Sequence, residues 1–187
     1  LGTNRCILGE GVGLTAQGDL RLMPDDNLAI SERLASEARY DLTTTRLFRD
    51  VGAWYNIIVI YDSTQGTASN RVKIYVNGSQ ITSFGTSDYP DQNLDIKIGA
   101  NENHNIGRDV EQTNPYYDGY MAEINFVDGF QLTPSSFGYT EFQTRIWKPK
   151  GYFGSYGTNG FRLDFSDNSA ATSVTLGKDR SGQGNDF

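Results

Sequence analysis

The dipeptide Asn77-Gly78, between two runs of β-forming residues, constrains the fold of this chain more than any other feature. A type I′ turn needs positive φ angles at both central residues, and Asn followed by Gly adopts them at little cost. The two-residue loop sets Val76 opposite Ser79. One face of the resulting hairpin is apolar and consists of Val72, Ile74, Val76 and Ile81. Phe84 falls on the polar face, so we expect the second strand to bend or end before it.

Alternation of apolar and polar residues predicts further half-buried strands. It occurs in segments 94–98, 120–127 and 161–165. The segment Trp54–Tyr61 is apolar on both faces, so we expect a strand in the middle of a sheet, covered on both sides. The segment Leu28–Tyr40 fits either a strand or an amphipathic helix, and its β neighbours favour a strand that runs into a loop. Thr133 and Pro134 suit the start of a single helical turn.

The composition is that of one large all-β domain with enough apolar residues for one core. The chain has 187 residues, of which 37% are hydrophobic, and its net charge of -7 argues against binding to nucleic acid or anionic membranes. The longest apolar run, Ile57–Tyr61, is too short to span a bilayer, so we expect a soluble domain without membrane insertion. Cys6 is the only cysteine, and we expect it to be buried and unpaired. Because Leu1 is not Met and no signal sequence follows, we expect a piece of a longer protein.

Three motifs follow one another in a characteristic order: Trp54–Asp62, Ile74–Gly78 and Tyr117–Ile124, with Leu132-Thr133-Pro134 after them. In this order they resemble the concanavalin A-like lectin/glucanase superfamily in its laminin-G-like form, over roughly residues 12 to 146. The resemblance implies an all-β jelly-roll sandwich of two antiparallel sheets.

The segments around Phe48–Asp50 and Trp147–Asp167 are similar to domains of large bacteriophage virion proteins. We therefore expect a laminin-G-like domain over residues 1–146, whose opening resembles a domain entered after its first strand. Residues 147–187 would form a Gly/Tyr-rich strap and a strand. Asp179–Phe187 is similar to the start of a further repeat.

Some members of the superfamily are glycoside hydrolases with spaced acidic residues on one strand. Glu123–Asp128 is a near match, but Asn125 stands where the middle Asp is needed. His104 is the only histidine and lies in a polar sequence, where we expect a solvated loop side chain rather than a catalytic base. The sequence therefore predicts a domain that is not an enzyme.

Glycan binding would use aromatic faces against pyranose rings, with amide and carboxylate groups at the hydroxyls. The candidate residues are Tyr116, Tyr117, Asp118, Asn103 and His104. For Tyr116, ligand binding and packing remain equally open, whereas packing is favoured for Tyr152 to Tyr156. Calcium is a further candidate ligand, and Asp62, Asn101 and Asp109 could supply oxygen atoms, although polar loops commonly contain such residues.

The resemblance implies a non-catalytic domain of a bacteriophage tail fibre or similar appendage, which would be extracellular and part of the virion. Its partners would be host-surface glycans or other virion subunits, including copies of itself in a homo-oligomer. The alternative is a carbohydrate-binding module of a secreted glycosidase or adhesin.

Overall fold

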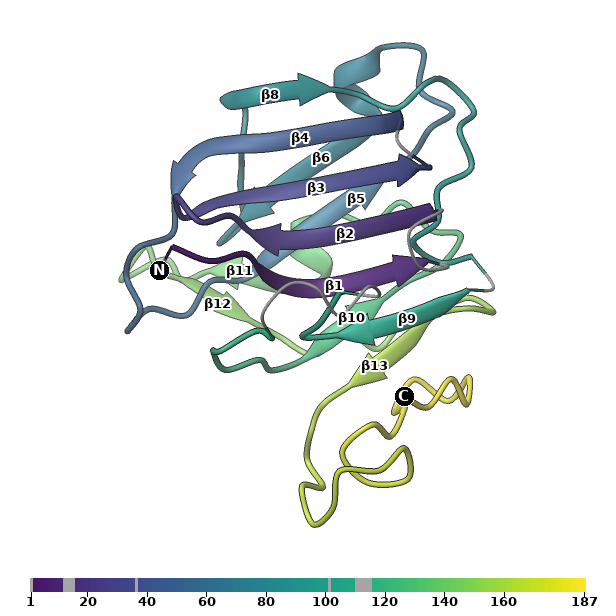
Figure 1. Cartoon of the computed structure of the whole chain (residues 1–187). Helices are drawn as coiled ribbons and strands as arrows, with labels where there is room; N and C mark the ends of the chain where they lie inside the picture. Colours follow the sequence, from purple (N-terminus) through teal and green to yellow (C-terminus); the bar gives the residue numbers. More distant parts are fainter. Residues whose placement is uncertain (1, 12–15, 36, 101, 110–115) are drawn as a thin grey trace. The chain divides into compact units, whose positions relative to one another are not determined.

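The computed structural model describes residues 2–11, 16–35, 37–100, 102–109 and 116–187, which form two compact units (Figure 1). The larger unit comprises residues 1–117 and 131–152, and the smaller comprises 118–130 and 153–187. The boundary expected at residue 146 remains a prediction. In the described part of the chain, no helix has the length and apolar character needed to cross a membrane.

A six-stranded antiparallel sheet dominates the larger unit, in the order β8-β4-β3-β2-β1-β9 (Figure 1). Its strands are β1 (Arg5–Gly11), β2 (Ala16–Leu22), β3 (Asn27–Leu34), β4 (Glu37–Leu47), β8 (Phe84–Asp88) and β9 (Asn103–Ile106). Apolar and polar residues alternate along these strands, for example Leu28, Ile30 and Leu42 on one face and Ser31 and Asp41 on the other. The apolar face packs onto the second layer.

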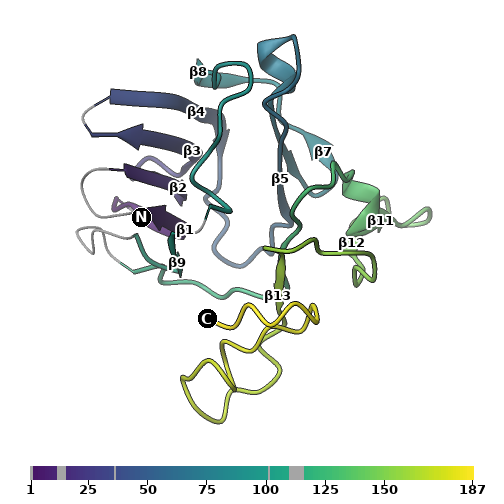
Figure 2. The ribbon, with the colours of Figure 1, turned by 90° about the vertical axis from the view of Figure 1, so that its right-hand side faces the viewer.

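The second layer is a three-stranded sheet of β5 (Ile57–Tyr61), β6 (Val72–Val76) and β7 (Ser79–Gln80), which faces the larger sheet in Figure 2. The buried core between the layers consists of Leu28, Ile30, Tyr40, Leu42, Phe48, Val72, Ile74 and Val76. The predicted all-β sandwich is confirmed. Cys6, on the larger sheet, is buried as expected, and burial raises the pKa of its thiol to about 12.

The predicted hairpin is confirmed in its turn and its register. Asn77 and Gly78 have φ angles of 50° and 76°, and Val76 pairs with Ser79. The second strand ends at Gln80, and Phe84 begins β8 in the other sheet, in agreement with the expected break.

Two strand predictions were wrong, and one ambiguous segment is resolved. β5 lies at the edge of its sheet and each of its residues is only half-buried. The segment 94–98 forms no strand although its apolar residues pack on the core, and the backbone N–H of Lys97 donates to the side chain of Glu32 rather than to a neighbouring strand. Leu28–Leu34 lies in strand β3, as favoured, and β4, which begins at Glu37, pairs antiparallel with it.

A small hairpin of β11 (Gly138–Thr140) and β12 (Trp147–Pro149) follows a single 3₁₀ turn, Pro134–Ser136. The turn was predicted, but Thr133 does not cap it with its side chain, which bonds Ser135 Oγ instead. The indole of Trp147 covers Gly78 so closely that a Cβ atom there would lie 2.4 Å from its Cε3.

The smaller unit is built around the pair β10 (Ile124–Phe126) and β13 (Phe161–Leu163). Both are shorter than the predicted strands at 120–127 and 161–165. The rings of Phe126 and Phe161 stack with centroids 5.5 Å apart, and Phe187 meets Phe161 edge-on at 4.6 Å. These contacts give the unit an aromatic core of its own.

Candidate functional site

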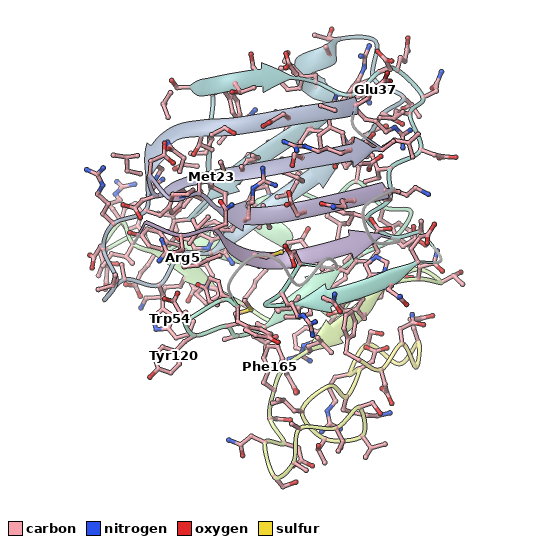
Figure 3. The ribbon with its side chains drawn as sticks, in the orientation of Figure 1. Arg5, Met23, Glu37, Trp54, Tyr120 and Phe165 are labelled. Carbon is pink, nitrogen blue, oxygen red and sulfur yellow. The ribbon has the colours of Figure 1, made fainter. Side chains whose placement is uncertain are left out.

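The outer face of the six-stranded sheet carries a row of polar side chains. The register places Asp19 beside Ser31, Ser31 beside Asp41 and Asp41 beside Asp88, in a line across β2, β3, β4 and β8. This face is turned toward the viewer in Figure 3, and no strand or helix covers it there. Ser31 is buried and Asp19 nearly so, whereas Asp41 is half-buried and Asp88 exposed, so the β4–β8 end of the row is the accessible one.

Charges on this row are balanced at one end only. The Arg21 guanidinium bonds both carboxylate oxygens of Asp19 and donates to Ser31 Oγ at 2.9 Å. Asp41 accepts a hydrogen bond from Thr43 Oγ1 at 3.1 Å. Within the described part of the chain, no basic side chain forms an ion pair with Asp41 or Asp88.

The core-facing side of the same sheet holds two buried glutamates on either side of a glycine. Glu10 pairs in register with Gly18, and Gly18 pairs with Glu32. Both carboxyl groups have no exposed surface. Glu32 is fully bonded, since one oxygen accepts from Arg39 Nη1 and the other from Lys97 N at 2.7 Å.

Glu10 differs from Glu32 because neither of its oxygens has a hydrogen-bond partner among the described residues. Burial, followed by the charge of Glu32, raises the pKa of Glu10 to about 8. The charge of Lys97 opposes this rise and that of Glu102 adds to it. Glu10 is therefore a carboxylic acid that stays largely protonated at neutral pH.

His104 is not the solvated loop residue that the sequence suggested. It lies on β9 opposite Glu10, and its Nε2 accepts a hydrogen bond from Gly99 N at 3.1 Å. Nδ1 lies 3.0 Å from the carbonyl oxygen of Glu102, so it carries the proton and donates it. Burial lowers the pKa of His104, which favours this neutral form. Both ring nitrogens are thus used by the fold, whereas the neighbouring Asn103 is exposed.

Tyr116 is an exposed aromatic residue among the predicted glycan-binding residues. Its side chain is 66% exposed, and the guanidinium carbon of Arg108 lies 5.5 Å from its ring centroid. Tyr117 is half-buried and its N–H donates to Gly107 O at 2.8 Å, which anchors the backbone beside Tyr116. Asp118 is exposed and begins the smaller unit.

The other aromatic candidates mostly pack, as favoured. Tyr152 meets Phe137 at 5.2 Å between centroids, and the buried Tyr156 donates its hydroxyl to Asn125. Phe153 is the exception, because it is 91% exposed.

The calcium candidates have different surroundings. Asp62 accepts hydrogen bonds from Thr64 N, Thr64 Oγ1 and Gln65 Nε2, and the side-chain bonds lower its pKa. Asp109 is buried, and Asn101 lies outside the described residues. Among the residues that the structure describes, no three His, Cys, Asp or Glu side chains gather into a metal site. Calcium binding stays a prediction.

The acidic residues of the near match to a hydrolase motif form hydrogen bonds that hold the smaller unit together. Glu123 accepts two hydrogen bonds from Arg162, at 3.0 and 2.9 Å, across the β10–β13 pair. Asp128 accepts hydrogen bonds from the backbone and side chain of Asn159. Each carboxylate thus has a structural partner on the other segment of the unit.

Sequence reasoning missed the polar row on β2, β3, β4 and β8 and the two buried glutamates. The sequence did carry a signal for the β2 part of the polar row, because polar and apolar residues alternate strictly in Asp19-Leu20-Arg21-Leu22. Glu10 and Glu32 had no such signal, because a glutamate in a strand ordinarily indicates a solvent-facing position.

Comparison with known proteins identifies the family. Searches of curated proteins and of solved structures gave no match. A laminin G family model, described as the concanavalin A-like lectin/glucanases superfamily, matches residues 5–135. This range contains every strand of the two facing sheets. The chain therefore belongs to the laminin-G-like family of the concanavalin A-like lectin/glucanase superfamily.

Proposed function

We propose that this chain is a non-catalytic recognition domain of a bacteriophage virion appendage, such as a tail fibre, and that it binds host-surface glycans. Family membership supports this class of function, because laminin-G-like domains often bind carbohydrate or mediate adhesion. The virion assignment rests on the similarity of Trp147–Asp167 to phage structural proteins. The structural roles of Glu123 and Asp128 agree with a domain that does not hydrolyse its ligand.

The observation that carries glycan binding is the exposed Tyr116 ring beside Arg108. A tyrosine face can stack on the apolar side of a pyranose, and a guanidinium can donate hydrogen bonds to ring hydroxyls or to a sugar carboxylate. The bond from Tyr117 N to Gly107 O fixes the backbone next to the ring. Little conformational entropy is then lost when a sugar binds.

A glycan array followed by calorimetry tests this site. We expect Tyr116→Ala to weaken binding of the best array ligand at least tenfold, which corresponds to about 1.4 kcal/mol. Trp54→Ala is the matched control, because Trp54 is also 66% exposed and lies in the same unit. Equal losses in both variants, or no glycan bound by the wild type, would reject Tyr116 as the binding residue.

The virion assignment needs a separate measurement. Mass spectrometry of purified particles of a phage whose genome encodes this chain should detect its peptides in stoichiometric amounts. Detection only in the secreted fraction, beside a glycosidase, would support the carbohydrate-binding module instead.

A further inference from the structure

The connection between β11 and β12 presents apolar and basic side chains to solvent. Phe142 is 81% exposed, Ile146 61% and Tyr139 51%, and the guanidinium of Arg145 lies 5.1 Å from the Phe142 ring centroid. We call these four residues the aromatic tip. Aromatic and arginine side chains of this kind contribute most of the binding energy in protein interfaces.

The aromatic tip is held in place before any partner binds. Glu141 N donates to Ile146 O, and Arg145 N donates to Glu141 O, both at 2.9 Å. The Glu141 carboxylate also accepts from Thr144 Oγ1 at 2.6 Å and Lys148 Nζ at 2.7 Å. A preorganised loop loses less conformational entropy on binding than a mobile one.

The charge of this hairpin is opposite to that of the whole chain. Residues 138–150 contain the basic residues Arg145, Lys148 and Lys150 and one acidic residue, Glu141, whereas the chain carries a net charge of -7. A basic tip on an acidic protein is complementary to the surface of another copy of the same protein.

The outer face of the six-stranded sheet offers a matching acidic position. Asp41 on β4 and Asp88 on β8 are directly opposite each other, and like charges in this arrangement destabilise a sheet. β8 is also an open edge of the sheet. Within the described part of the chain, no basic side chain forms an ion pair with either aspartate. A cationic group of another molecule would therefore stabilise the pair.

We propose that copies of this chain associate head to tail, with the aromatic tip of one copy on the Asp41–Asp88 edge of the next. The two surfaces belong to different layers: Figure 2 shows the β11–β12 hairpin on the side of the three-stranded sheet, while β8 is at the edge of the other sheet. A contact between two different surfaces repeats from copy to copy and generates a ring or a filament. This inference does not rest on glycan binding.

Sedimentation velocity over a concentration series of the 187-residue chain tests the interface. The wild type should form species larger than a dimer, and Arg145→Glu or Asp88→Lys should each raise the dissociation constant at least tenfold. Arg46→Glu is the matched control, because Arg46 also lies over an aromatic ring, that of Phe48 at 5.4 Å, but outside the tip. It should associate like the wild type.

Mixing the two variants gives the decisive result. The Asp88→Lys chain retains an intact tip and the Arg145→Glu chain an intact edge, and the two altered surfaces are again opposite in charge, so an equimolar mixture should recover the association that each variant alone has lost. Recovered association also shows that both variants are folded. A wild type that stays monomeric up to about 1 mM, the concentration at which binding of about 4 kcal/mol is detectable, would overturn the proposal. A mixture that stays monomeric, or variants that associate like the wild type, would overturn it as well.

Discussion

Glu10 and Glu32 show how the same side chain at the same depth can have two different hydrogen-bonding environments. Both are completely buried on one face of the six-stranded sheet, but only Glu32 has hydrogen-bond donors at its carboxylate. An ionised carboxylate without donors is costly in a protein interior, so Glu10 keeps its proton instead. The carboxyl group of Glu10 therefore links protonation to stability.

Stability of the larger unit should fall as the pH rises from about 4.5, the ordinary pKa, to about 8. In this window folded Glu10 retains a proton that the unfolded chain has lost, so deprotonation favours unfolding. The slope should approach about 1.4 kcal/mol per pH unit, and stability should level off above the folded pKa. Urea unfolding at several pH values measures this slope.

The variant Glu10→Gln should reduce this slope, because a glutamine has the same shape but no proton to lose, and the remainder comes from Glu32, whose pKa burial also raises. At pH 9 it should be more stable than the wild type by several kcal/mol, because only the wild type then carries an ionised, unpartnered carboxylate in its interior. A variant that keeps the wild-type pH profile would show that another group causes the dependence.

At the scale of elements, the β6–β7 turn and the β11–β12 hairpin depend on each other through one glycine. Gly78 has a φ of 76°, and the ring of Trp147 lies where its Cβ would be. The turn therefore requires glycine for its backbone and for its packing. The sequence motif revealed only the first of these reasons.

Gly78→Ala should destabilise the larger unit by about 2 kcal/mol or more, since about 1 kcal/mol comes from the left-handed backbone and the rest from the displaced indole. A double-mutant cycle with Trp147→Leu, measured by urea unfolding, separates the two causes. The cost of Gly78→Ala should shrink in the Trp147→Leu background. An unchanged cost would assign the whole effect to the backbone.

Asp179 organises the last loop of the smaller unit. Although burial opposes its ionisation, hydrogen bonds from the backbone of Arg162, Ser181 and Asn185 lower its pKa. Its carboxylate therefore stabilises the loop above its usual pKa, and this contribution is lost as the pH falls through the lowered value.

Asp179→Ala should remove an acceptor shared by four backbone N–H groups, including that of Gly184. We expect hydrogen exchange at the Gly184 and Asn185 amides to accelerate at least tenfold, a loss of about 1.4 kcal/mol of local protection. Asp167→Asn, an exposed turn residue that bonds Ser169, is the control and should leave these amides unchanged. Slow exchange at both amides in Asp179→Ala would contradict the assigned role.

The sequence predicted those elements whose pattern is local. The Asn77-Gly78 hairpin was predicted to the residue, because turn type and side-chain alternation depend on neighbours in the chain. The edge position of β5 and the missing strand at 94–98 were not, since both depend on which distant segment supplies hydrogen bonds. For the same reason His104 was predicted to lie in a loop: Asn103–Ile106 becomes the strand β9 only by pairing with the distant strand β1.

At the scale of the whole molecule, the net charge of -7 makes copies of the chain repel one another in most orientations. The basic β11–β12 hairpin is the exception, because it attracts an acidic surface of another copy. The proposed association should therefore weaken with salt. Between about 50 and 500 mM NaCl the screening length falls from roughly 14 to 4 Å, and we expect the dissociation constant to rise about tenfold. Sedimentation at both ionic strengths measures this change, and tighter association at high salt would indicate a purely apolar contact.

The position of β1 also has a consequence for synthesis. β1 lies between β2, which follows at once, and β9, whose Ile106 pairs with Leu8. At about 5–20 residues per second, a ribosome needs roughly 5–20 s after Leu8 before that second neighbour exists. During this interval the emerging chain exposes one unpaired edge of β1, so its yield in a cell should depend on chaperones that bind nascent polypeptides.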